Sequence, residues 1–331
     1  MRLAFDARCE AEAHSSFARV LQLLRKAAEE VSIPIENWRY GECTADVIWS
    51  PNSTLPKLKG IKKVATIHDI NPLLEDGRVG WKRALRKRQF REKVRSVIQN
   101  ADRIATVSEF SKSCLEKEFS AIRPLLNVVP NYPAPQFHSS IQPASLQKLN
   151  IPPNSILFLA ALRRHKGWDT LVRAWCQLPK EAREAHPLVL AGSNKRVGNK
   201  PFQIAATKGV TNEGIFLPGI IPDSLLPSLF QSAKVFVFPS LAEGFGLPPL
   251  EAMACGTPVI AAHSTSLPEV LGNACLWFRP GNAMELAERI LEIIQLPDSK
   301  QISKIGVAQA KLWSAKKTGE AMLKTLEQLH S

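Results

Sequence analysis

The segment 235–260 constrains the fold of this chain more than any other stretch. It opens with Val235 to Phe238, a short apolar run that is typical of a buried parallel strand. Two glycines follow, a pair of prolines fits the first turn of a helix, and a Gly-Thr-Pro sequence ends that helix before another apolar run. This order of strand, loop, helix and strand predicts part of a doubly wound parallel sheet, with a ligand-binding loop at its carboxyl edge.

Two carboxylates bracket this loop, Glu243 before the helix and Glu251 about one turn inside it. The backbone N–H groups at the start of the helix favour phosphate, and ionised carboxylates accept hydrogen bonds from sugar diols. Phosphate and polyol together indicate a nucleotide sugar. The alternative is that both glutamates are solvated and the glycines only shape a turn. The candidate phosphate-binding residues are Gly244, Phe245, Gly246 and Leu247.

The spacing Glu-x7-Glu, with Gly-Phe-Gly-Leu-Pro between and Ala-Met-Ala-Cys-Gly-Thr-Pro-Val after, resembles the signature of the retaining glycosyltransferases of family 4. The resemblance covers nearly the whole chain. It implies an α/β protein of the GT-B fold, with two doubly wound Rossmann-like domains facing across a cleft. We expect an acceptor-side domain at 1–150, a nucleotide-sugar-binding domain at 151–310, and a helix at 311–331 that packs back on the first domain.

The cationic segment after the strand at 155–162 is a second candidate element of the donor site. Arg163, Arg164 and Lys166 lie at a strand-to-helix turn, where clustered cations can neutralise a diphosphate. The family resemblance implies that Lys166 and one of the two arginines do so, and the spacing leaves open which arginine. The alternative is a loose surface cluster.

Three further residues enter through the resemblance alone. Gly192 follows a predicted strand at 188–191, and Gly219 with Ile220 follows another at 214–218. In the family, backbone groups after such a glycine commonly contact the nucleobase, so these residues are expected to bind the donor.

His68 is the candidate catalytic residue of the first domain, because a His-Asp pair follows the predicted strand at 62–67. The alternative is a histidine satisfied by a backbone carbonyl. The resemblance favours function, since the family's Thr-Ile-His-Asp segment directs its histidine at the reacting sugar. The family's glycine-rich first loop is replaced here by His14 to Arg19, so a non-catalytic relative that only binds nucleotide sugars stays open.

The net charge of +13 implies an anionic partner, whether nucleic acid, acidic lipid or a phosphorylated substrate. Much of this charge lies in the predicted helix 80–100, where eight basic residues face one glutamate and four apolar residues recur at helical spacing. Such a helix can lie on an anionic membrane or pack as an ordinary helix with a solvated face. Without several interleaved aromatic residues or a binding motif, nucleic acid is not expected as a partner, although a basic nucleic-acid-binding protein remains an alternative.

The six cysteines are scattered without metal-ligand spacing, which favours reduced thiols in a cytoplasmic protein. The N-terminus lacks the features of a signal peptide, and no apolar run is long enough to span a membrane. No Asp-x-Asp motif, Gly-x-Gly-x-x-Gly motif or P-loop is present, so we expect no metal and no cofactor.

Together these features predict a retaining, metal-independent transfer of a hexose to a glycan or a lipid-linked acceptor. Segments around His68 and Ser108 resemble bacterial surface-polysaccharide mannosyltransferases, which favours GDP-mannose over a UDP-sugar as the donor. The sequence leaves open the acceptor, the linkage and the way in which the anomeric configuration is retained.

Overall fold

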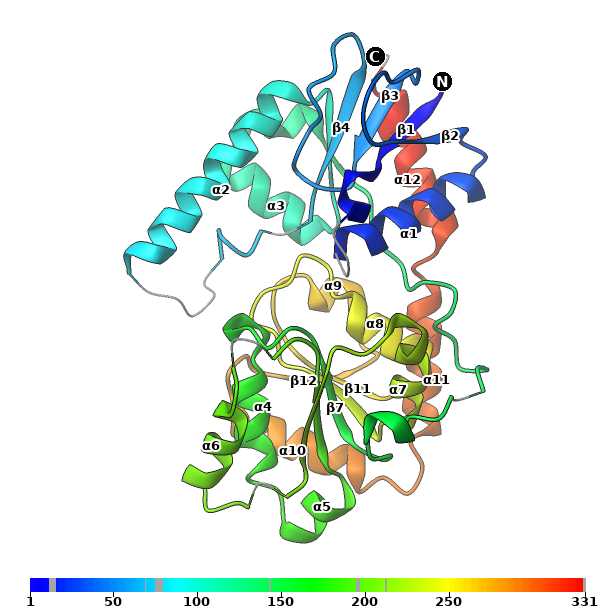
Figure 1. Cartoon of the computed structure of the whole chain (residues 1–331). Coiled ribbons are helices and arrows are strands. Elements are labelled where there is room, and N and C mark those ends of the chain that lie inside the picture. Colours follow the sequence, from blue (N-terminus) through cyan, green and yellow to red (C-terminus); the bar gives the residue numbers. More distant parts are fainter. Residues whose placement is uncertain are drawn as a thin grey trace. The chain divides into compact units, whose positions relative to one another are not determined.

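A computed structural model describes residues 1–11, 16–68, 70–74, 80–142, 144–194, 197–211 and 213–329. The chain divides into two compact units (Figure 1). The first unit comprises Met1–Tyr132 and Trp313–Ser331, and the second comprises Pro133–Leu312. Within the described residues, each unit contains one six-stranded sheet in which every recorded strand pair is parallel, as the alternating pattern predicts.

The sheet of the first unit has the strand order β2-β1-β3-β4-β5-β6. Its inner strands are buried because both faces carry helices, so their residues are almost all apolar. The strands are β1 (Leu3–Asp6), β2 (Ile35–Trp38), β3 (Val47–Ser50), β4 (Lys62–Ile67), β5 (Arg103–Thr106) and β6 (Leu126–Val128), and the helices are α1 (Ser16–Glu30), α2 (Trp81–Asn100), α3 (Glu109–Glu118) and α12 (Ala315–Glu327).

Helix α2 packs as an ordinary amphipathic helix, with one face against the rest of the first unit. Val94 and Val97 are buried in an apolar cluster, with Phe90 and Ile98 packed partly against it. Its remaining faces carry the basic residues, and Trp81 and Leu85 near its start are 71% and 45% exposed. The apolar face that the sequence predicts for this helix is therefore present, and residues of the first unit cover it.

The C-terminal helix α12 packs against α1 (Figure 1). A Cβ atom at Gly319 would lie 2.3 Å from the carbonyl oxygen of Ala27, so only glycine permits this approach. The Thr318 hydroxyl donates to the Pro130 carbonyl at 2.8 Å, and the Asn127 amide donates to Gln328 at 3.0 Å. Residues from the two ends of the chain thus belong to one unit.

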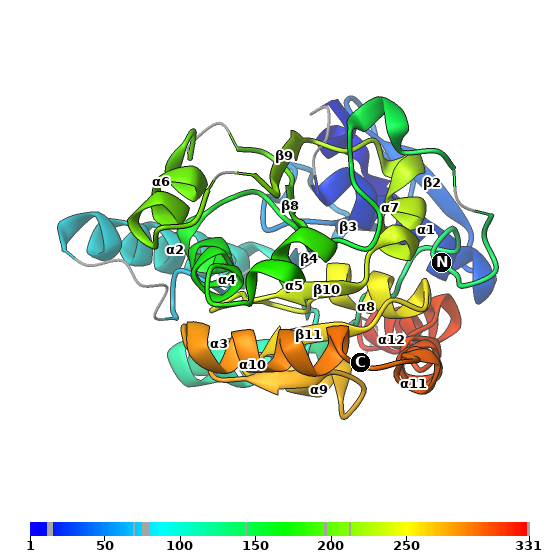
Figure 2. The ribbon, with the colours of Figure 1, turned by 90° about the horizontal axis from the view of Figure 1, so that it is seen from below.

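The second sheet has the strand order β12-β11-β10-β7-β8-β9. Helix α10 packs against α4 on one side of this sheet (Figure 2). The strands are β7 (Ile156–Leu159), β8 (Leu188–Ala191), β9 (Ile215–Gly219), β10 (Val235–Phe238), β11 (Val259–Ala262) and β12 (Leu276–Phe278), and the helices are α4 (Trp168–Trp175), α5 (Lys180–Ala185), α6 (Lys200–Thr207), α7 (Leu226–Ser232), α8 (Leu247–Ala254), α9 (Leu267–Leu271), α10 (Ala283–Ile294) and α11 (Lys300–Lys311).

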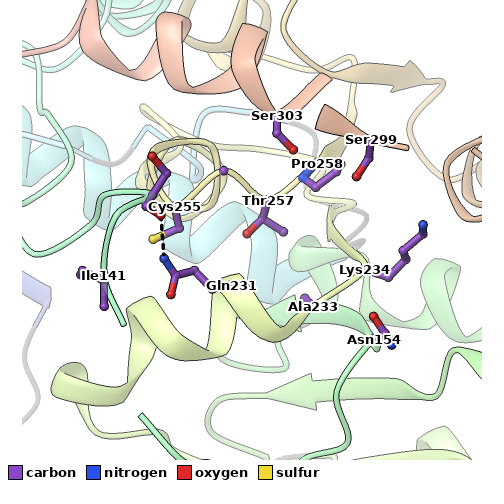
Figure 3. Close-up of a pocket in the computed structure, with 12 residues that line it drawn as sticks. Ile141, Asn154, Gln231, Ala233, Lys234, Cys255, Thr257, Pro258, Ser299 and Ser303 are labelled. Carbon is purple, nitrogen blue, oxygen red and sulfur yellow. Dashed lines mark hydrogen bonds between the residues drawn. The ribbon is translucent and has the colours of Figure 1, made fainter. Parts of the chain in front are cut away.

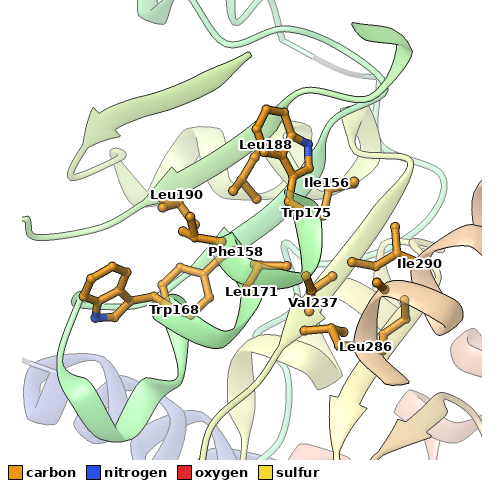
Figure 4. Close-up of a cluster of buried hydrophobic side chains, with 14 of the residues drawn as sticks. Ile156, Phe158, Trp168, Leu171, Trp175, Leu188, Leu190, Val237, Leu286 and Ile290 are labelled. Atoms are coloured by element: carbon orange, nitrogen blue, oxygen red, sulfur yellow. The ribbon is translucent and has the colours of Figure 1, made fainter. Parts of the chain in front are cut away.

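Strand β10 shows how the core of this unit is divided between the two faces of the sheet. Val235 and Val237 face the apolar cluster drawn in Figure 4, together with residues of α4 and α10. The alternate residues Phe236 and Phe238 stack on each other on the opposite face, and Phe236 meets the ring of Phe230 edge-on. Phe238 ends the strand and lies next to the loop that carries Glu243.

Residues 133–150 belong to the second unit, whereas the expected boundary placed them in the first. The reason is local packing. Phe137 contacts the ring of Phe230, and the backbone N–H of Ala144 donates to the Ser228 hydroxyl at 2.8 Å, both on α7. This segment therefore packs on the second unit before the chain enters β7.

Candidate active site

The candidate donor residues gather at one edge of the second sheet. Residues 163–166 follow β7, Gly192 follows β8, Gly219 ends β9, and residues 243–247 follow β10. Because all of these strands are parallel, their carboxyl ends lie along the same edge, where α/β proteins bind ligands. The fold thus brings together residues that are far apart in the sequence.

Backbone hydrogen bonds connect the loop after β7 to the loop after β10. The backbone N–H of Leu241 and the hydroxyl of Ser240 both donate to the carbonyl of His165, at 2.8 and 3.2 Å. Gly167 has a φ of +68°, and a Cβ atom there would lie 2.0 Å from the Pro239 carbonyl oxygen. This close approach fixes Lys166 opposite the loop that carries the first glutamate of the motif.

Lys166 and Glu243 form an ion pair, with the Lys166 Nζ atom 2.6 Å from the Glu243 Oε1 atom. Their side chains are only 20% and 12% exposed, so the pair is largely shielded from water. The ammonium also lies 5.8 Å from the centre of the Phe238 ring. The sequence prediction assigned these two residues to separate groups of one donor, its phosphate and its sugar, and the structure shows that each is also the other's partner.

Three hydroxyl residues between β11 and α9 hold the loop of Glu243 in place. The backbone N–H of Glu243 donates to the Thr265 hydroxyl at 3.1 Å, and the Ser266 hydroxyl donates to the carbonyls of Glu243 and Phe245. The Ser264 hydroxyl binds the Ser240 carbonyl at 2.8 Å. Sequence analysis missed these supporting residues, although the Ser-Thr-Ser run after a strand was a usable signal.

Helix α8 begins directly after this loop, as predicted. Gly246 precedes its first residue with a φ of +103°, and a Cβ atom there would lie 2.5 Å from the Leu267 Cδ2 atom. The two prolines occupy the first helical positions, where no intrahelical hydrogen bond is lost. Gly244, Phe245 and Gly246 are buried, and the phosphate contact expected from the backbone N–H groups of 244–247 stays a prediction.

Glu251 lies inside α8 and is only 1% exposed. The prediction that it holds the ribose diol therefore concerns a carboxylate within the protein and not on its surface. Burial of a carboxylate is costly without polar partners, which excludes the alternative that this glutamate is simply solvated. The same holds for Glu243, which is 9% exposed and ion-paired.

Arg163 and Arg164 are both exposed, in contrast to Lys166. Neither is recorded in an ion pair with a carboxylate of the described residues. Their charges are available to an anionic ligand, and the structure favours neither arginine over the other. They come directly before the shielded pair of Lys166 and Glu243 along the same loop.

Gly192, the glycine predicted after β8, is required by close backbone contacts. A Cβ atom at Gly192 would lie 2.1 Å from the carbonyl oxygen of Ala160, and its N–H donates to the Gly219 carbonyl at 2.7 Å. These contacts join β7, β8 and β9 at their carboxyl ends. Ile220, next to Gly219, is 55% exposed and offers an apolar surface at this edge.

His68 lies in the first unit, directly after β4. Its Nε2 atom is 2.8 Å from the carbonyl oxygen of Pro51, which can only accept, so Nε2 carries the proton. Burial lowers the pKa of His68 to about 4, and the hydrogen bond to Pro51 opposes this shift in part. The ring is therefore neutral near pH 7 and packs 5.9 Å from the ring of Phe17.

This geometry includes the carbonyl contact that sequence analysis gave as the alternative for His68. A catalytic role for the neutral ring stays a prediction. Asp69 and the stretch His14–Ser15, also considered in the sequence, lie outside the described residues.

A separate cavity lies at the opposite edge of the second sheet (Figure 3). Its volume is about 490 Å³, and its lining includes Asn154, Lys234 and Pro258, which come just before β7, β10 and β11. This cavity is therefore at the amino ends of the strands and is distinct from the edge that carries Lys166 and Glu243.

Other site chemistries find little support in the part of the chain that the structure describes. No group of three or more His, Cys, Asp or Glu residues has a metal-binding arrangement there. All six cysteines are free thiols, and burial raises the pKa of Cys255 to about 12, so this thiol is not a nucleophile at neutral pH. Among the described helices, none has the length and apolar character to cross a membrane.

Comparison with known proteins identifies relatives of this chain. Residues 142–307 match the family described as glycosyl transferases group 1. The O-antigen chain mannosyltransferase B of Escherichia coli is 31% identical over 316 residues, which covers 90% of this chain and 78% of that protein.

Solved structures resemble the whole chain in fold. Sucrose-phosphate synthase from Thermosynechococcus elongatus has a TM-score of 0.76 at 19% identity and covers 100% of this chain and 99% of its own. Anabaena Alr3699/HepE in complex with UDP and glucose has a TM-score of 0.73 at 17% identity and covers 99% of both chains. The expected GT-B architecture, with two Rossmann-like halves, is confirmed.

The neutral state of the half-buried His68 ring predicts that acid destabilises the first unit. In the unfolded chain this histidine takes up a proton near its ordinary pKa of 6.5, whereas the folded chain resists protonation down to about pH 4. The free energy of unfolding should fall as the pH drops through this range, by on the order of 3 kcal/mol from this group. Above pH 6.5 the group adds no further pH dependence. Thermal unfolding from pH 4 to 7, compared between the unmodified chain and His68→Gln, measures the effect.

The variant should lose less stability on acidification than the unmodified chain. His138→Gln, which changes an exposed histidine, serves as the matched control and should follow the unmodified chain. Equal loss of stability in all three proteins would show that His68 takes up its proton as easily in the folded state as in the unfolded one.

Proposed function

Because this chain belongs to the group 1 glycosyl transferases, we propose that it transfers a hexosyl group from a nucleotide sugar to a hydroxyl of a glycan or a lipid-linked acceptor. The single observation that carries this proposal within the family is the shielded Lys166–Glu243 pair at the carboxyl edge of the second sheet. A cation and a carboxylate lie next to each other there, which supports binding of a diphosphate and of a sugar.

Lys166 and one of the two arginines, Arg163 or Arg164, supply the charge that a diphosphate leaving group needs. In the transition state the glycosidic bond lengthens, positive charge develops at the anomeric carbon, and negative charge develops on the departing phosphate. Fixed cations and the backbone N–H groups at the start of α8 stabilise that negative charge. We propose that this cationic set makes the transfer independent of a divalent metal.

Glu243 and Glu251 would bind hydroxyl groups of the donor. Thr265 and Ser266 hold the backbone of Glu243, and the ion pair with Lys166 orients its carboxylate, which supports binding of a sugar next to Lys166. Glu251 is the proposed partner of the ribose diol. His68, neutral and protonated on Nε2, would contact the sugar or the acceptor as an uncharged group. Family membership supports retention of the anomeric configuration.

GDP-mannose is the proposed donor, with a UDP-sugar next. The first choice is supported by the relative from Escherichia coli, whose name describes a mannosyltransferase of the O-antigen chain. The second is supported by the similar fold of Alr3699/HepE, whose structure contains UDP and glucose. The same relative supports a role in the synthesis of a surface polysaccharide.

We further propose that the protein works at the cytoplasmic face of the membrane, held there peripherally by α2. The exposed Trp81 and Leu85 lie at the start of this helix, among its cations. Aromatic and aliphatic side chains enter the membrane interface, while each cation adds about 1 kcal/mol of attraction to anionic lipid. The buried Val94 and Val97 keep the helix attached to its own unit.

A panel of nucleotide sugars tests the proposed activity. Thermal unfolding with GDP-mannose, UDP-glucose, GDP and UDP should show the largest rise in midpoint with the guanosine ligands, because a bound ligand stabilises the folded state. Release of the nucleoside diphosphate in the presence of an acceptor glycan should then follow for the donor that binds. Binding without release would favour the non-catalytic relative, and a shift with oligonucleotides alone would favour nucleic-acid binding. Either result would contradict the proposal.

Loss of either partner of the buried pair should abolish most of the activity. Lys166→Ala removes the cation at the leaving group, and Glu243→Ala removes the sugar contact, so each should lower kcat by about 100-fold or more. The double variant should lose less than the product of the two, because the partners act together. Turnover is measured as release of nucleoside diphosphate, and circular dichroism checks the fold.

The matched control is the pair of Arg173 and Asp169 on α4, whose nitrogen and oxygen lie 3.2 Å apart and whose side chains are 47% and 28% exposed. Arg173→Ala should leave turnover within a factor of about two, because an exposed pair contributes little. Full turnover in the Lys166→Ala or Glu243→Ala protein would remove that residue from the proposed site.

A further inference from the structure

A cavity of about 570 Å³ lies within the first unit, away from the proposed donor residues. The segment between β3 and β4 forms one wall, together with Lys63, which is the second residue of β4. The last two turns of α2 form the other wall. The lining consists of Ser53, Thr54, Leu55, Pro56, Lys57, Leu58, Lys59, Lys63, Lys93, Ser96, Val97 and Asn100.

Four of these lining residues are lysines, and none is an acid. Lys57, Lys59 and Lys93 are exposed at the rim, and Lys63 is half-buried. Among the described residues, no carboxylate is recorded in an ion pair with any of the four. Like charges gathered around one cavity repel one another, so this arrangement favours an anionic ligand.

The nearby carboxylate of Asp102 already has other partners. Its Oδ1 atom binds the Lys62 ammonium at 2.8 Å, and its Oδ2 atom accepts the backbone N–H of Lys63 at 2.8 Å. Lys62 points to this acid, while its neighbour Lys63 lines the cavity, as successive residues of a strand point to opposite faces. The charge of the cavity is therefore not neutralised from the strand that borders it.

The rest of the lining is divided between hydroxyl or amide groups and an apolar floor. Val97 is 3% exposed and Pro56 is buried, with Leu55 and Leu58 beside them. A phosphate oxygen can accept hydrogen bonds from hydroxyl, amide and ammonium groups together, and an apolar substituent can rest on the floor. Cations around an apolar floor suit a phosphate that carries an apolar group better than they suit a free acidic sugar.

We propose that this cavity binds the phosphate or diphosphate group of an anionic ligand, through Lys57, Lys59, Lys63 and Lys93. The source of that group is either the headgroup of a membrane lipid or a soluble phosphate ester, and the chemistry at the lysines is the same for both. The site is separate from His68: Lys63 and His68 lie at opposite ends of β4, roughly 16 Å apart along the strand. It requires neither donor binding nor transfer.

Labelling of lysines with an amine-reactive ester, read by mass spectrometry at each residue, tests the proposal on the whole chain. One arm adds sodium pyrophosphate, a second adds vesicles of phosphatidylcholine and phosphatidylglycerol, and a third adds phosphatidylcholine vesicles alone, all at one ionic strength. The four cavity lysines should be protected in the first or second arm and labelled freely in the third. The reading at each residue keeps phosphate binding at Lys166 separate.

Lys26, Lys117 and Lys316 are the internal controls, because they are exposed lysines of the same unit outside the cavity. Protection in the pyrophosphate arm identifies a soluble phosphate ester, and protection confined to the anionic vesicles identifies a lipid headgroup. Equal labelling of the cavity lysines in all arms, or equal protection of the control lysines, would overturn the proposal.

A pair of triple variants adds a measurement of affinity. Replacing Lys57, Lys59 and Lys93 by Gln should weaken binding of the protecting ligand by about tenfold or more, because three charge-assisted contacts are lost. Replacing Lys26, Lys117 and Lys316 by Gln removes the same charge and should change binding by less than about twofold. An equal loss of affinity in both triple variants would show that binding depends only on net charge, and would rule out the assigned site.

Discussion

The ion pair between Lys166 and Glu243 is the interaction on which the rest of the site depends. Two opposite charges are held 2.6 Å apart at the edge of the second sheet, largely out of water. Neither residue could be left there alone without a cost, because a buried charge needs a partner. A diphosphate sugar can replace both partners at once, since its phosphate suits the lysine and its hydroxyls suit the glutamate. Under the proposed function, the pair thus holds two groups in position for one ligand.

The framework around this pair explains why it stays in place. Ser240 and Leu241 donate to the His165 carbonyl, so hydrogen bonds connect the two loops that carry the charges. Thr265 and Ser266 hold the backbone of Glu243 from a third loop. Every one of these contacts lies at the carboxyl ends of parallel strands, which is where the doubly wound fold leaves room for a ligand. Rigid support of this kind favours catalysis by fixed charges.

Much of the architecture could be predicted from the sequence because its signals are local. The strands β4 and β10 were predicted at their observed positions. The edge strands β2 and β12 were missed, since Ile35–Trp38 has two adjacent polar residues between its apolar ends and Leu276–Phe278 is very short. The hydroxyls at 264–266 and the four-lysine cavity depend on residues that only the fold brings together. The Ser-Thr-Ser run at 264–266 indicates a turn after a strand, but its contacts with the loop of Glu243 are long-range, and no local pattern reports them.

A crystal structure of the whole chain with GDP-mannose bound at the site of the second unit tests the central claim most directly. The quantity to measure is the distance from the Lys166 Nζ atom to the Glu243 Oε1 atom, which is 2.6 Å here. The account predicts that the pair separates, with Lys166 on a phosphate oxygen and Glu243 on a hydroxyl of the sugar. A bound nucleotide sugar that leaves this pair closed and lies away from both residues would contradict it.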